Sequence, residues 1–315
     1  MSKNCFVGID TSNYTTSLAI ADEEGKIVAN LKIPLSVKSG ERGLRQSDAV
    51  FQHTKNLPEI FSLAEEYFEK YQPIAVGVSS TPRSCEGSYM PCFLAGRSAA
   101  YALAKTARIP LYELSHQNGH VAAAAYSGGA PEEIFKSPFL AFHVSGGTTE
   151  ALFVTPDGSD IKCKLIGGTK DINAGQAIDR VGVEMGLSFP CGAEMERLAL
   201  ENTQKLPKPN ICVNDGYCNL SGLENKAVEL YKKTGDKSLV SAYVLNFVGA
   251  TLEKITEHTV NEYGALPIVY SGGVMSCSLL QKRLKKENRY FAEPRFSADN
   301  AAGIALLCRR RYLEK

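Results

Sequence analysis

The chain has 315 residues, enough for one large domain or for two lobes that each bury a core. Its 35 Lys and Arg side chains are balanced by 34 Asp and Glu, so the net charge of +1 excludes a globally basic nucleic-acid-binding protein and confines any RNA contact to a local patch. A hydrophobic content of 44% excludes a disordered chain. The sequence contains no run of about eighteen apolar residues, so it predicts no membrane-spanning helix.

The cysteines and the first residues predict the cellular compartment. Nine cysteines are scattered without a Cys-x-x-Cys pair, which is typical of small buried thiols in a reducing cytosol. The spacings of Cys85 to Cys92 and of Cys212 to Cys218 match no standard zinc pattern, so a metal or redox role is the weaker interpretation of either pair. The start of the chain leads into a strand rather than a signal peptide, and we expect a cytoplasmic protein.

The first predicted elements form a three-stranded meander. An apolar strand at Phe6–Ile9 leads through the polar turn Asp10–Asn13 to a second strand at Ser17–Ile20. The acidic turn Asp22–Gly25 then leads to a third strand at Ile27–Leu31. Strands separated by polar, glycine-ended turns are typical of antiparallel pairing.

The same order of elements returns in the second half of the chain. The strands are predicted at Leu140–Val144, Ala151–Val154 and Ile161–Ile166, with the loop Ser145–Thr149 and the turn Thr155–Gly158 between them. The repeat is too long for a solenoid. It predicts two homologous lobes, each of which opens with a meander.

Helices and further strands follow each meander. The predicted helices are Ser47–Tyr71, Ala95–Ala107, Leu239–Tyr263, Ser278–Arg289 and Asn300–Tyr312, and the predicted strands are Ile74–Val78 and Pro267–Tyr270. Strands that alternate with helices predict an α/β fold. With the lobe junction at Pro131–Pro138, we expect an N-terminal lobe at residues 1–135, a C-terminal lobe at 136–298, and a final helix at 299–315 that packs back toward the N-terminal lobe.

Two histidines, His116 and His120, stand four residues apart, and Asp299 opens the last predicted helix. Side chains at i and i+4 share one face of a helix, so two imidazoles can bind one metal and a distant carboxylate can complete the site. A purely structural pair of histidines is also common at this spacing, and the sequence leaves both interpretations open. Gln117 stands where H-E-x-x-H proteases place their Glu base, so the spacing does not favour a protease.

Three loops that follow apolar strands predict a ligand site. They are residues 10–13, 145–149 and 271–274. Glycines let backbone N–H groups approach a phosphate, and ligands of open α/β sheets bind beyond the carboxyl ends of the strands. A plain tight turn explains one Gly-Gly loop, but two in duplicated lobes favour nucleotide binding. No P-loop or Rossmann motif occurs, which disfavours both of those folds.

Seven motifs in this order carry a family resemblance over nearly the whole chain. They are Ile9–Ser12, His116–His120, Val144–Thr149, Ala174–Arg180, Ser221–Leu223, Ser271–Val274 and Asp299–Ala302. The chain resembles the superfamily of actin, the heat-shock chaperone ATPases and the sugar kinases. Within that superfamily it resembles the TsaD-like tRNA threonylcarbamoyladenosine transferases, formerly called glycoproteases.

The resemblance implies a fold, a reaction and a set of ligands. The fold would be two duplicated RNase H-like lobes with a nucleotide cleft between them. The reaction would be metal-assisted acyl transfer, from threonylcarbamoyl-AMP to N6 of adenosine 37 in tRNAs that read codons starting with A. One divalent metal, iron or zinc, and ATP or an acyl-adenylate would be bound, and tRNA and TsaB-like and TsaE-like proteins would be partners.

The resemblance also implies roles for individual residues. The metal would be held by His116, His120 and Asp299. The nucleotide would be held by Val144, Ser145, Gly146, Gly147, Thr148, Asp179, Gly192, Gly272 and Gly273. Asp179 would also be the catalytic residue and would orient a ribose or a metal-bound water; a polar contact within Ala174–Arg180 is the simpler alternative.

The chain departs from the family pattern at several positions, which predicts a divergent paralogue. The family's first loop reads Glu-Thr-Ser-Cys-Asp-Glu-Thr where this chain has Asp10–Thr16, and its Gly-Pro-Gly turn is replaced by Thr81–Ser84. Single family residues are also replaced: Glu by Asn118, His by Thr148, Asn by Cys277 and Lys by Glu224. Changes around metal ligands commonly lower affinity or activity.

Three functions therefore stay open at this point. The first is the family reaction on tRNA, for which Lys282–Arg289 and Arg309–Arg311 could contact phosphates, although an ordinary solvated helix face explains them more simply. The second is a carbamoyl, acyl or phosphoryl transfer to another acceptor that still uses metal and nucleotide. The third is a nucleotide-binding scaffold without catalysis. A peptidase is disfavoured because no nucleophile with an adjacent base is evident.

Overall fold

The computed structural model describes residues 2–12, 14–37, 44–297 and 301–314. The chain divides into two compact units. Unit 1 comprises Met1–Tyr126, Thr155–Cys163 and Arg295–Lys315, and unit 2 comprises Ser127–Val154 and Lys164–Pro294. Each unit contains a sheet with helices packed against it, so the predicted α/β fold is confirmed. Among the described helices, none has both the length and the apolar character that crossing a membrane requires.

The five-stranded sheet of unit 1 has the order β3-β2-β1-β4-β5. Its first three strands are β1 (Lys3–Ser12), β2 (Thr15–Asp22) and β3 (Ile27–Pro34), and both pairings between them are antiparallel. The predicted meander is therefore confirmed. The strands β4 (Tyr71–Thr81) and β5 (Leu111–Ser115) extend the sheet in parallel to β1, so three strand ends gather at one edge.

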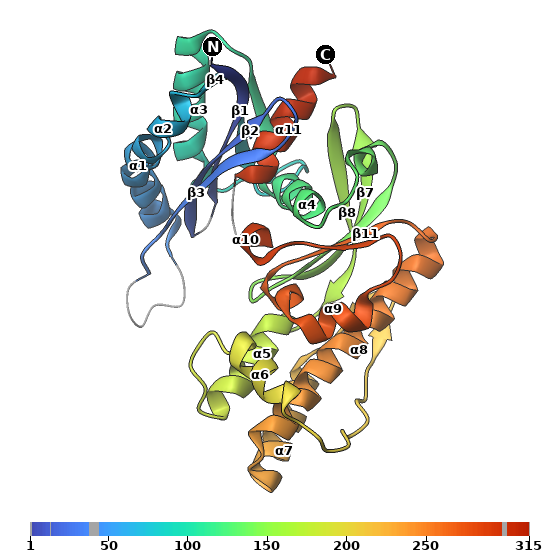
Figure 1. Ribbon diagram of the computed structural model, residues 1–315. Helices are drawn as coiled ribbons and strands as arrows, with labels where there is room; N and C mark the ends of the chain where they lie inside the picture. Colours follow the sequence, from blue (N-terminus) through green and yellow to red (C-terminus); the bar gives the residue numbers. More distant parts are fainter. Residues whose placement is uncertain (1, 13, 38–43, 298–300, 315) are drawn as a thin grey trace. The chain divides into compact units, whose positions relative to one another are not determined.

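Alternating side chains of β1 build two cores, one on each face of this sheet. Val7 and Ile9 face α1 (Gln46–Leu63) and α3 (Phe93–Ala107), whereas Phe6 faces α11 (Ala302–Leu313). The pattern follows from the period of two along a strand. Figure 1 shows α1 and α3 on one side of the sheet and α11 on the other.

The helix predicted at residues 47–71 is wrong beyond its first part. The helix α1 ends at Leu63, a single turn α2 (Glu65–Phe68) follows, and β4 begins at Tyr71. Tyr71 pairs with Lys3 of β1, so pairing with a distant strand overrides the local helical periodicity.

Two glycines let α11 lie directly on the sheet. Gly8 of β1 and Gly77 of β4 are side-by-side partners in the register. A Cβ at Gly8 would lie 2.5 Å from the Ala301 carbonyl oxygen, and one at Gly77 would lie 2.8 Å from Cβ of Cys308. The absence of both side chains is therefore what brings the helix into contact with the strands.

The seven-stranded sheet has the order β12-β11-β6-β7-β8-β10-β9. Its central meander is β6 (Phe139–Val144), β7 (Thr149–Asp157) and β8 (Asp160–Thr169), which confirms the predicted repeat. Residues 155–163, at the tip of the β7–β8 hairpin, belong to unit 1. The short strands are β9 (Val213–Asn214), β10 (Tyr217–Cys218), β11 (Ile268–Ser271) and β12 (Arg289–Phe291).

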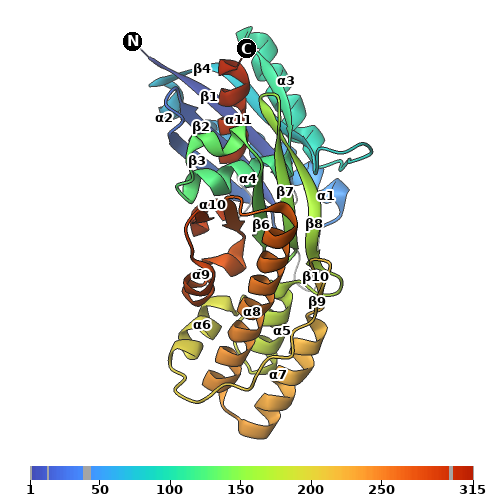
Figure 2. The same ribbon diagram turned by 90° about the vertical axis from the view of Figure 1, so that its right-hand side faces the viewer.

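One core of unit 2 lies between this sheet and its helices. The long α8 (Lys237–Tyr263) contacts α6 (Gly192–Leu200) and α7 (Ser221–Thr234), and α5 (Ala174–Glu184) contacts all three (Figure 2). The shorter elements are η1 (Glu132–Lys136), η2 (Gly273–Ser276), α9 (Ser278–Leu284) and, across the unit boundary, α10 (Pro294–Ser297).

The predicted helix at residues 278–289 is wrong at its end. The helix α9 stops at Leu284, and Arg289–Phe291 form the edge strand β12 beside β11. The aromatic ring of Phe291 stacks on Tyr270 at 4.9 Å between ring centroids. Aromatic pairing between adjacent strands therefore outweighs the basic, helix-favouring sequence that precedes it.

Candidate metal and nucleotide sites

The two histidines lie on one helix of unit 1, as predicted. The helix α4 (His116–Ser127) begins directly after β5, so His116 stands at the carboxyl edge of the sheet. The imidazole rings of His116 and His120 are 4.3 Å apart between centroids and nearly perpendicular, at 79°. The i,i+4 spacing therefore brings both rings to one place.

A buried carboxylate holds the first of these rings. Nδ1 of His116 lies 2.6 Å from Oδ2 of Asp10, which is two residues before the end of β1 and is 1% exposed. The other oxygen of Asp10 accepts the backbone N–H of Ser12 at 2.8 Å. The sequence places Asp10 in a candidate phosphate loop and gives no sign of this contact, because the partners are 106 residues apart.

Glycine allows a second helix to reach the histidines. Gly119 lies between His116 and His120, and its carbonyl oxygen would be only 1.8 Å from a Cβ on Gly303 of α11. Helix α11 thus crosses α4 at the histidine pair, in a contact that only glycine at position 303 permits.

Asn118, which replaces the family's Glu, connects α4 to the tip of the β7–β8 hairpin through hydrogen bonds. The side chain is fully buried, and its Nδ2 donates to Oδ1 of Asp160 at 3.1 Å and to the carbonyl oxygen of Ile161 at 2.7 Å. Oδ2 of Asp160 in turn pairs with Arg311 of α11. The departure from the family pattern therefore has a structural role within unit 1.

The donor set at the histidine pair fits a divalent cation. Two imidazoles suit iron or zinc, and the buried hydroxyl of Ser12, whose N–H bonds the Asp10 carboxylate that holds His116, has no hydrogen-bond partner among the described residues. Within residues 2–12, 14–37, 44–297 and 301–314, no group of three or more His, Cys, Asp or Glu forms a metal cluster. The predicted third ligand, Asp299, lies outside those residues, so its part in the site stays a prediction.

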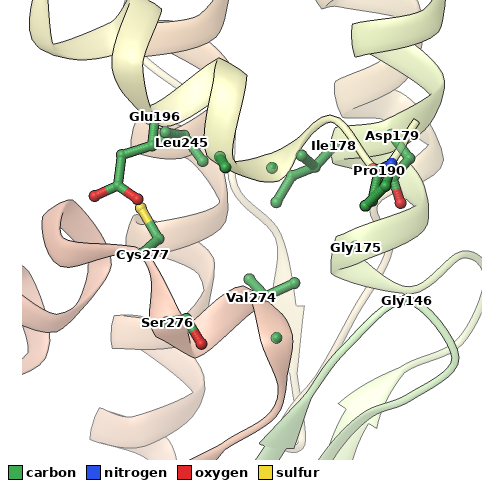
Figure 3. Close-up of a pocket in the computed structure, with 13 residues that line it drawn as sticks. Gly146, Gly175, Ile178, Asp179, Pro190, Glu196, Leu245, Val274, Ser276 and Cys277 are labelled. Atoms are coloured by element: carbon green, nitrogen blue, oxygen red, sulfur yellow. The ribbon is translucent and has the colours of Figure 1, made fainter. Parts of the chain in front are cut away.

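The predicted nucleotide residues gather around a pocket that lies wholly within unit 2. Its volume is about 430 Å³. Figure 3 shows Glu196 and Cys277 on one side of the pocket and Asp179 and Pro190 on the other. The lining residues are Gly146, Gly175, Ile178, Asp179, Pro190, Gly192, Ala193, Glu196, Leu245, Gly273, Val274, Ser276 and Cys277.

Backbone contacts between glycines shape this pocket. Gly272 has φ of +96°, and a Cβ there would lie 2.2 Å from the carbonyl oxygen of Val144. A Cβ on Gly175 would lie 2.7 Å from the backbone of Gly146. The ends of β6 and β11 and the start of α5 can therefore meet only because side chains are absent. Three backbone segments approach one another there, and loops of this kind after strands are where phosphates commonly bind.

Hydrogen bonds fix the loop after β6. Ser145 donates its N–H to the Thr148 carbonyl at 2.7 Å, and Ser145 Oγ accepts the Thr148 N–H at 3.1 Å. The Ser145 carbonyl accepts the N–H of Gly175 at 3.1 Å, which ties this loop to the first turn of α5. The loop is therefore held in one conformation at the pocket.

Two carboxylates face the pocket, and both also have structural partners. Oδ1 of Asp179 accepts the N–H of Cys191 at 2.8 Å, and Oε1 of Glu196 accepts both the N–H of Ser278, at 2.7 Å, and its hydroxyl. Cys277, which follows η2 on the same side of the pocket as Glu196, is buried, and this burial raises the pKa of its thiol to about 11. At neutral pH Cys277 is therefore a neutral, weakly polar group of the pocket wall.

Sequence analysis found part of this lining. Gly146, Asp179, Gly192 and Gly273 line the pocket. The other predicted residues are not in the lining: Val144 ends β6, and the loops after β6 and β11 contain Ser145, Gly147, Thr148 and Gly272. Gly175 and Glu196 were missed; Gly175 belongs to a motif that the family resemblance had marked, whereas no sequence signal marks Glu196.

Most of the arginines considered for tRNA phosphates are engaged within the chain. Arg283 bonds Glu253 and Asn246, Arg309 donates to the carbonyl of Glu23, and Arg311 pairs with Asp160. The lysines of the same basic segment, Lys282, Lys285 and Lys286, are exposed. The simpler interpretation, an ordinary protein surface, accounts for these arginines.

The comparisons with known proteins identify the family. The TsaD profile, described as tRNA N6-adenosine threonylcarbamoyltransferase, matches residues 43–306. An enzyme of that name from Thermus thermophilus is 32% identical over 97% of this chain and 92% of its own length. One from Streptococcus equi subsp. zooepidemicus is 28% identical over 99% and 93%. This chain belongs to the TsaD family. The predicted membership is thereby confirmed.

Solved structures of low sequence identity confirm the fold. Full-length HypF in its phosphate- and nucleotide-bound form has a TM-score of 0.60 at 14% identity, covering 100% of this chain and 56% of that one. The activator of 2-hydroxyisocaproyl-CoA dehydratase from Clostridium difficile with bound ADPNP has 0.54 at 13%, covering 98% and 96%. A ROK family glucokinase from Streptomyces griseus has 0.50 at 11%, covering 97% and 99%. The predicted actin, heat-shock chaperone and sugar-kinase fold is thus confirmed.

Proposed function

We propose that this chain transfers the threonylcarbamoyl group from threonylcarbamoyl-AMP to N6 of adenosine 37 in tRNA. The observation that carries the proposal is the pocket of unit 2, where three glycine-bearing backbone segments meet, in a chain of the TsaD family. AMP, the leaving group of this reaction, has the phosphate and purine that such a pocket accommodates.

The pocket residues would divide the recognition of the adenylate between them. The backbone N–H groups of Gly146 and Gly273, which line the pocket, would hold the phosphate. The carboxylate of Asp179 would accept a ribose hydroxyl while its Oδ1 keeps the bond to Cys191. Asp179 is therefore proposed as a binding and orienting group.

The histidine pair would hold the metal of the reaction. His116 and His120, completed by Asp299, would bind iron or zinc. Such a cation, when bound, polarises a carbonyl or a phosphate oxygen. The side chains around the pair fix the two rings: Asp10 bonds His116, and Asn118 anchors the helix between them.

The transfer forms one bond and breaks another. The exocyclic amine of adenosine attacks the carbamoyl carbon, the new C–N bond forms, and the bond from that carbon to the phosphate oxygen breaks. The amine loses a proton, and AMP departs with the electron pair. The chain would contribute by holding AMP, since donors fixed around a phosphate stabilise the negative charge that develops on it.

The proposed macromolecular partners are tRNA and TsaB-like and TsaE-like proteins. A net charge of +1 means that any tRNA contact is local. The exposed side chains Lys282, Lys285 and Lys286 are candidates for phosphate contacts.

Reconstitution of the reaction tests the proposed function. The purified chain is mixed with threonine, bicarbonate, ATP, an adenylate-forming enzyme and unmodified tRNA, and the digested nucleosides are analysed by mass spectrometry. We expect modified adenosine that disappears when this chain is omitted. Bound metal and ATP without modified adenosine would contradict the tRNA assignment, and the absence of both ligands would favour a scaffold without catalysis.

A second candidate is a carbamoyl or acyl transfer to a different acceptor. It is favoured by Cys277, because a buried thiol in the pocket wall cannot make the hydrogen bonds of the Asn that the family has there. Glu224, which replaces a family Lys, is paired with Arg180 at 3.1 Å and so has a structural role in unit 2. A Cys277→Asn variant that gains transfer to tRNA, where the wild type has none, would support this alternative.

A further inference from the structure

The carboxylate of Asp10 has no place in the nucleotide pocket, yet it is among the most restrained polar groups of unit 1. It is 1% exposed, and each of its two oxygens has a named partner: the N–H of Ser12 at 2.8 Å and Nδ1 of His116 at 2.6 Å. A buried carboxylate destabilises a protein unless it is paired and hydrogen-bonded. Its pairing with His116 is therefore a specific feature of this fold.

The backbone that carries Asp10 is also fixed. The hydroxyl of Ser17 donates to the Asp10 carbonyl at 3.2 Å across the β1–β2 pair. The next residue, Thr11, accepts the N–H of Gly96 at 3.1 Å and donates to the carbonyl of Cys92 at 3.0 Å, which ties the strand to the start of α3. The carboxylate therefore approaches His116 from a rigid strand.

This contact determines which nitrogen of His116 carries the proton. A carboxylate only accepts hydrogen bonds, so Nδ1 must be the protonated nitrogen of the neutral ring. Nε2 is then the nitrogen with a lone pair, which is the form of imidazole that binds metals. The ring of His120, one helical turn away, lies at 4.3 Å.

We infer that Asp10 is the positioning residue of the metal site: it holds His116 in the Nδ1-protonated tautomer and fixes the ring orientation in which Nε2 is the donor. The inference rests on the proposed metal role of His116 and His120. Partners of this kind around a metal ligand commonly change metal affinity by about 10- to 100-fold.

The tautomer is measured directly in the full-length, metal-free protein. Long-range ¹H–¹⁵N correlation spectra are recorded on histidine-labelled wild type above the ordinary histidine pKa. We expect His116 as the Nδ1-protonated form. A doubly protonated ring, or one protonated on Nε2, would overturn the inference even if every variant of Asp10 failed to fold.

The variant Asp10→Asn keeps the size of the side chain, but its amide can donate a hydrogen bond to Nδ1 of His116 as well as accept one. We expect mixed tautomers at His116 and an affinity for Zn²⁺ or Co²⁺ that falls about 10- to 100-fold. We also expect an altered visible spectrum of the Co²⁺ form. Asp10→Glu retains a carboxylate and should restore the wild-type tautomer.

A matched control removes a different histidine bond from the same sheet. Thr16 of β2 bonds Nδ1 of the buried His53 at 2.8 Å. Thr16→Val should leave the His116 tautomer and the metal affinity unchanged. Equal metal affinity in wild type and Asp10→Asn would refute the positioning role. Absence of transfer activity in a wild type with the expected tautomer would instead refute the proposed function.

Discussion

The two candidate sites are built in different ways. In unit 1, buried polar side chains from distant segments hold the histidines, as the contacts of Asp10 with His116 and of Asn118 with Asp160 show. In unit 2, the pocket is formed by backbone approach, with Gly272 against Val144 and Gly175 against Gly146. The first site depends on which polar side chains are present, and the second depends on glycines that have no side chain. The two sites should therefore respond to different substitutions.

The largest effect is expected from placing the family's Glu in unit 1. Asn118→Glu would bury a carboxylate against Oδ1 of Asp160 and the Ile161 carbonyl oxygen. Both of these atoms accept a hydrogen bond from Asn118, and a carboxylate has no hydrogen to donate to them. An uncompensated buried charge typically lowers the free energy of unfolding by about 3–5 kcal/mol. Denaturant unfolding of the purified variant measures this loss.

A second substitution tests the cause of that loss. Asp160→Asn removes the negative charge that would repel Glu at position 118 and supplies an N–H donor for it. The double variant Asn118→Glu/Asp160→Asn should therefore lose less free energy of unfolding than the two single variants lose together. If the losses in free energy of unfolding were simply additive, the contact between Asn118 and Asp160 would not be the reason that Glu is unfavourable at position 118.

The next effect tests the backbone of unit 2. Gly272→Ala would place a Cβ 2.2 Å from the Val144 oxygen at φ of +96°, and we expect a loss of about 2–3 kcal/mol in the free energy of unfolding together with loss of AMP binding. Gly222→Ala is the control, since a Cβ there meets no atom within 4 Å and Gly222 does not line the pocket. Similar stability of the two variants would show that close approach does not shape the pocket.

A smaller effect separates binding from structure at Asp179. Asp179→Asn keeps an acceptor for the Cys191 N–H, so its thermal stability should match the wild type, while its affinity for AMP should fall about 10-fold or more if the carboxylate accepts a ribose hydroxyl. Isothermal titration calorimetry measures the affinity. An unchanged affinity for AMP in Asp179→Asn would refute the ribose contact, and the hydrogen bond to Cys191 would then be the only role of Asp179 that is supported.

The smallest effect concerns pH. Burial alone would raise the pKa of Asp171, but hydrogen bonds from the Ser221 hydroxyl and from the N–H groups of Leu220, Ser221 and Ile172 outweigh it and lower the pKa to about 2. Because the folded pKa lies below the unfolded value, the stabilisation is complete above about pH 4 and is lost as the pH falls toward 2.

Asp171→Asn should therefore be slightly less stable than the wild type at neutral pH, and the difference should narrow as the pH falls through this window. Thermal unfolding between about pH 6 and pH 2.5 measures it. A constant difference across that range would show that the charge of Asp171 does not contribute.

Local patterns predicted the parts of this structure that depend on local periodicity. The apolar runs Phe6–Ile9 and Leu140–Val144, each followed by a polar turn, predict both meanders, and the spacing of His116 and His120 predicts their shared helix face. Periodicity failed at Tyr71 and at Arg289–Phe291, where pairing with a distant strand decides the structure.

The candidate sites were predictable where family motifs mark them and hidden where a contact joins distant segments. Asp10 and His116 are 106 residues apart, and Glu196 reaches the pocket through a helix that no motif marks. The sequence shows Asn118 only as a departure from the family pattern beside the metal histidines, whereas Asp160, 42 positions away, gives it a structural partner.

The most direct test of the account is a single turnover with preformed threonylcarbamoyl-AMP, the metal-loaded chain and unmodified tRNA, with AMP and modified adenosine both quantified. We expect the two products to appear in equal amounts, and we expect Gly272→Ala to abolish both while Gly222→Ala does not. Release of AMP without modified adenosine, or equal turnover in both glycine variants, would contradict it.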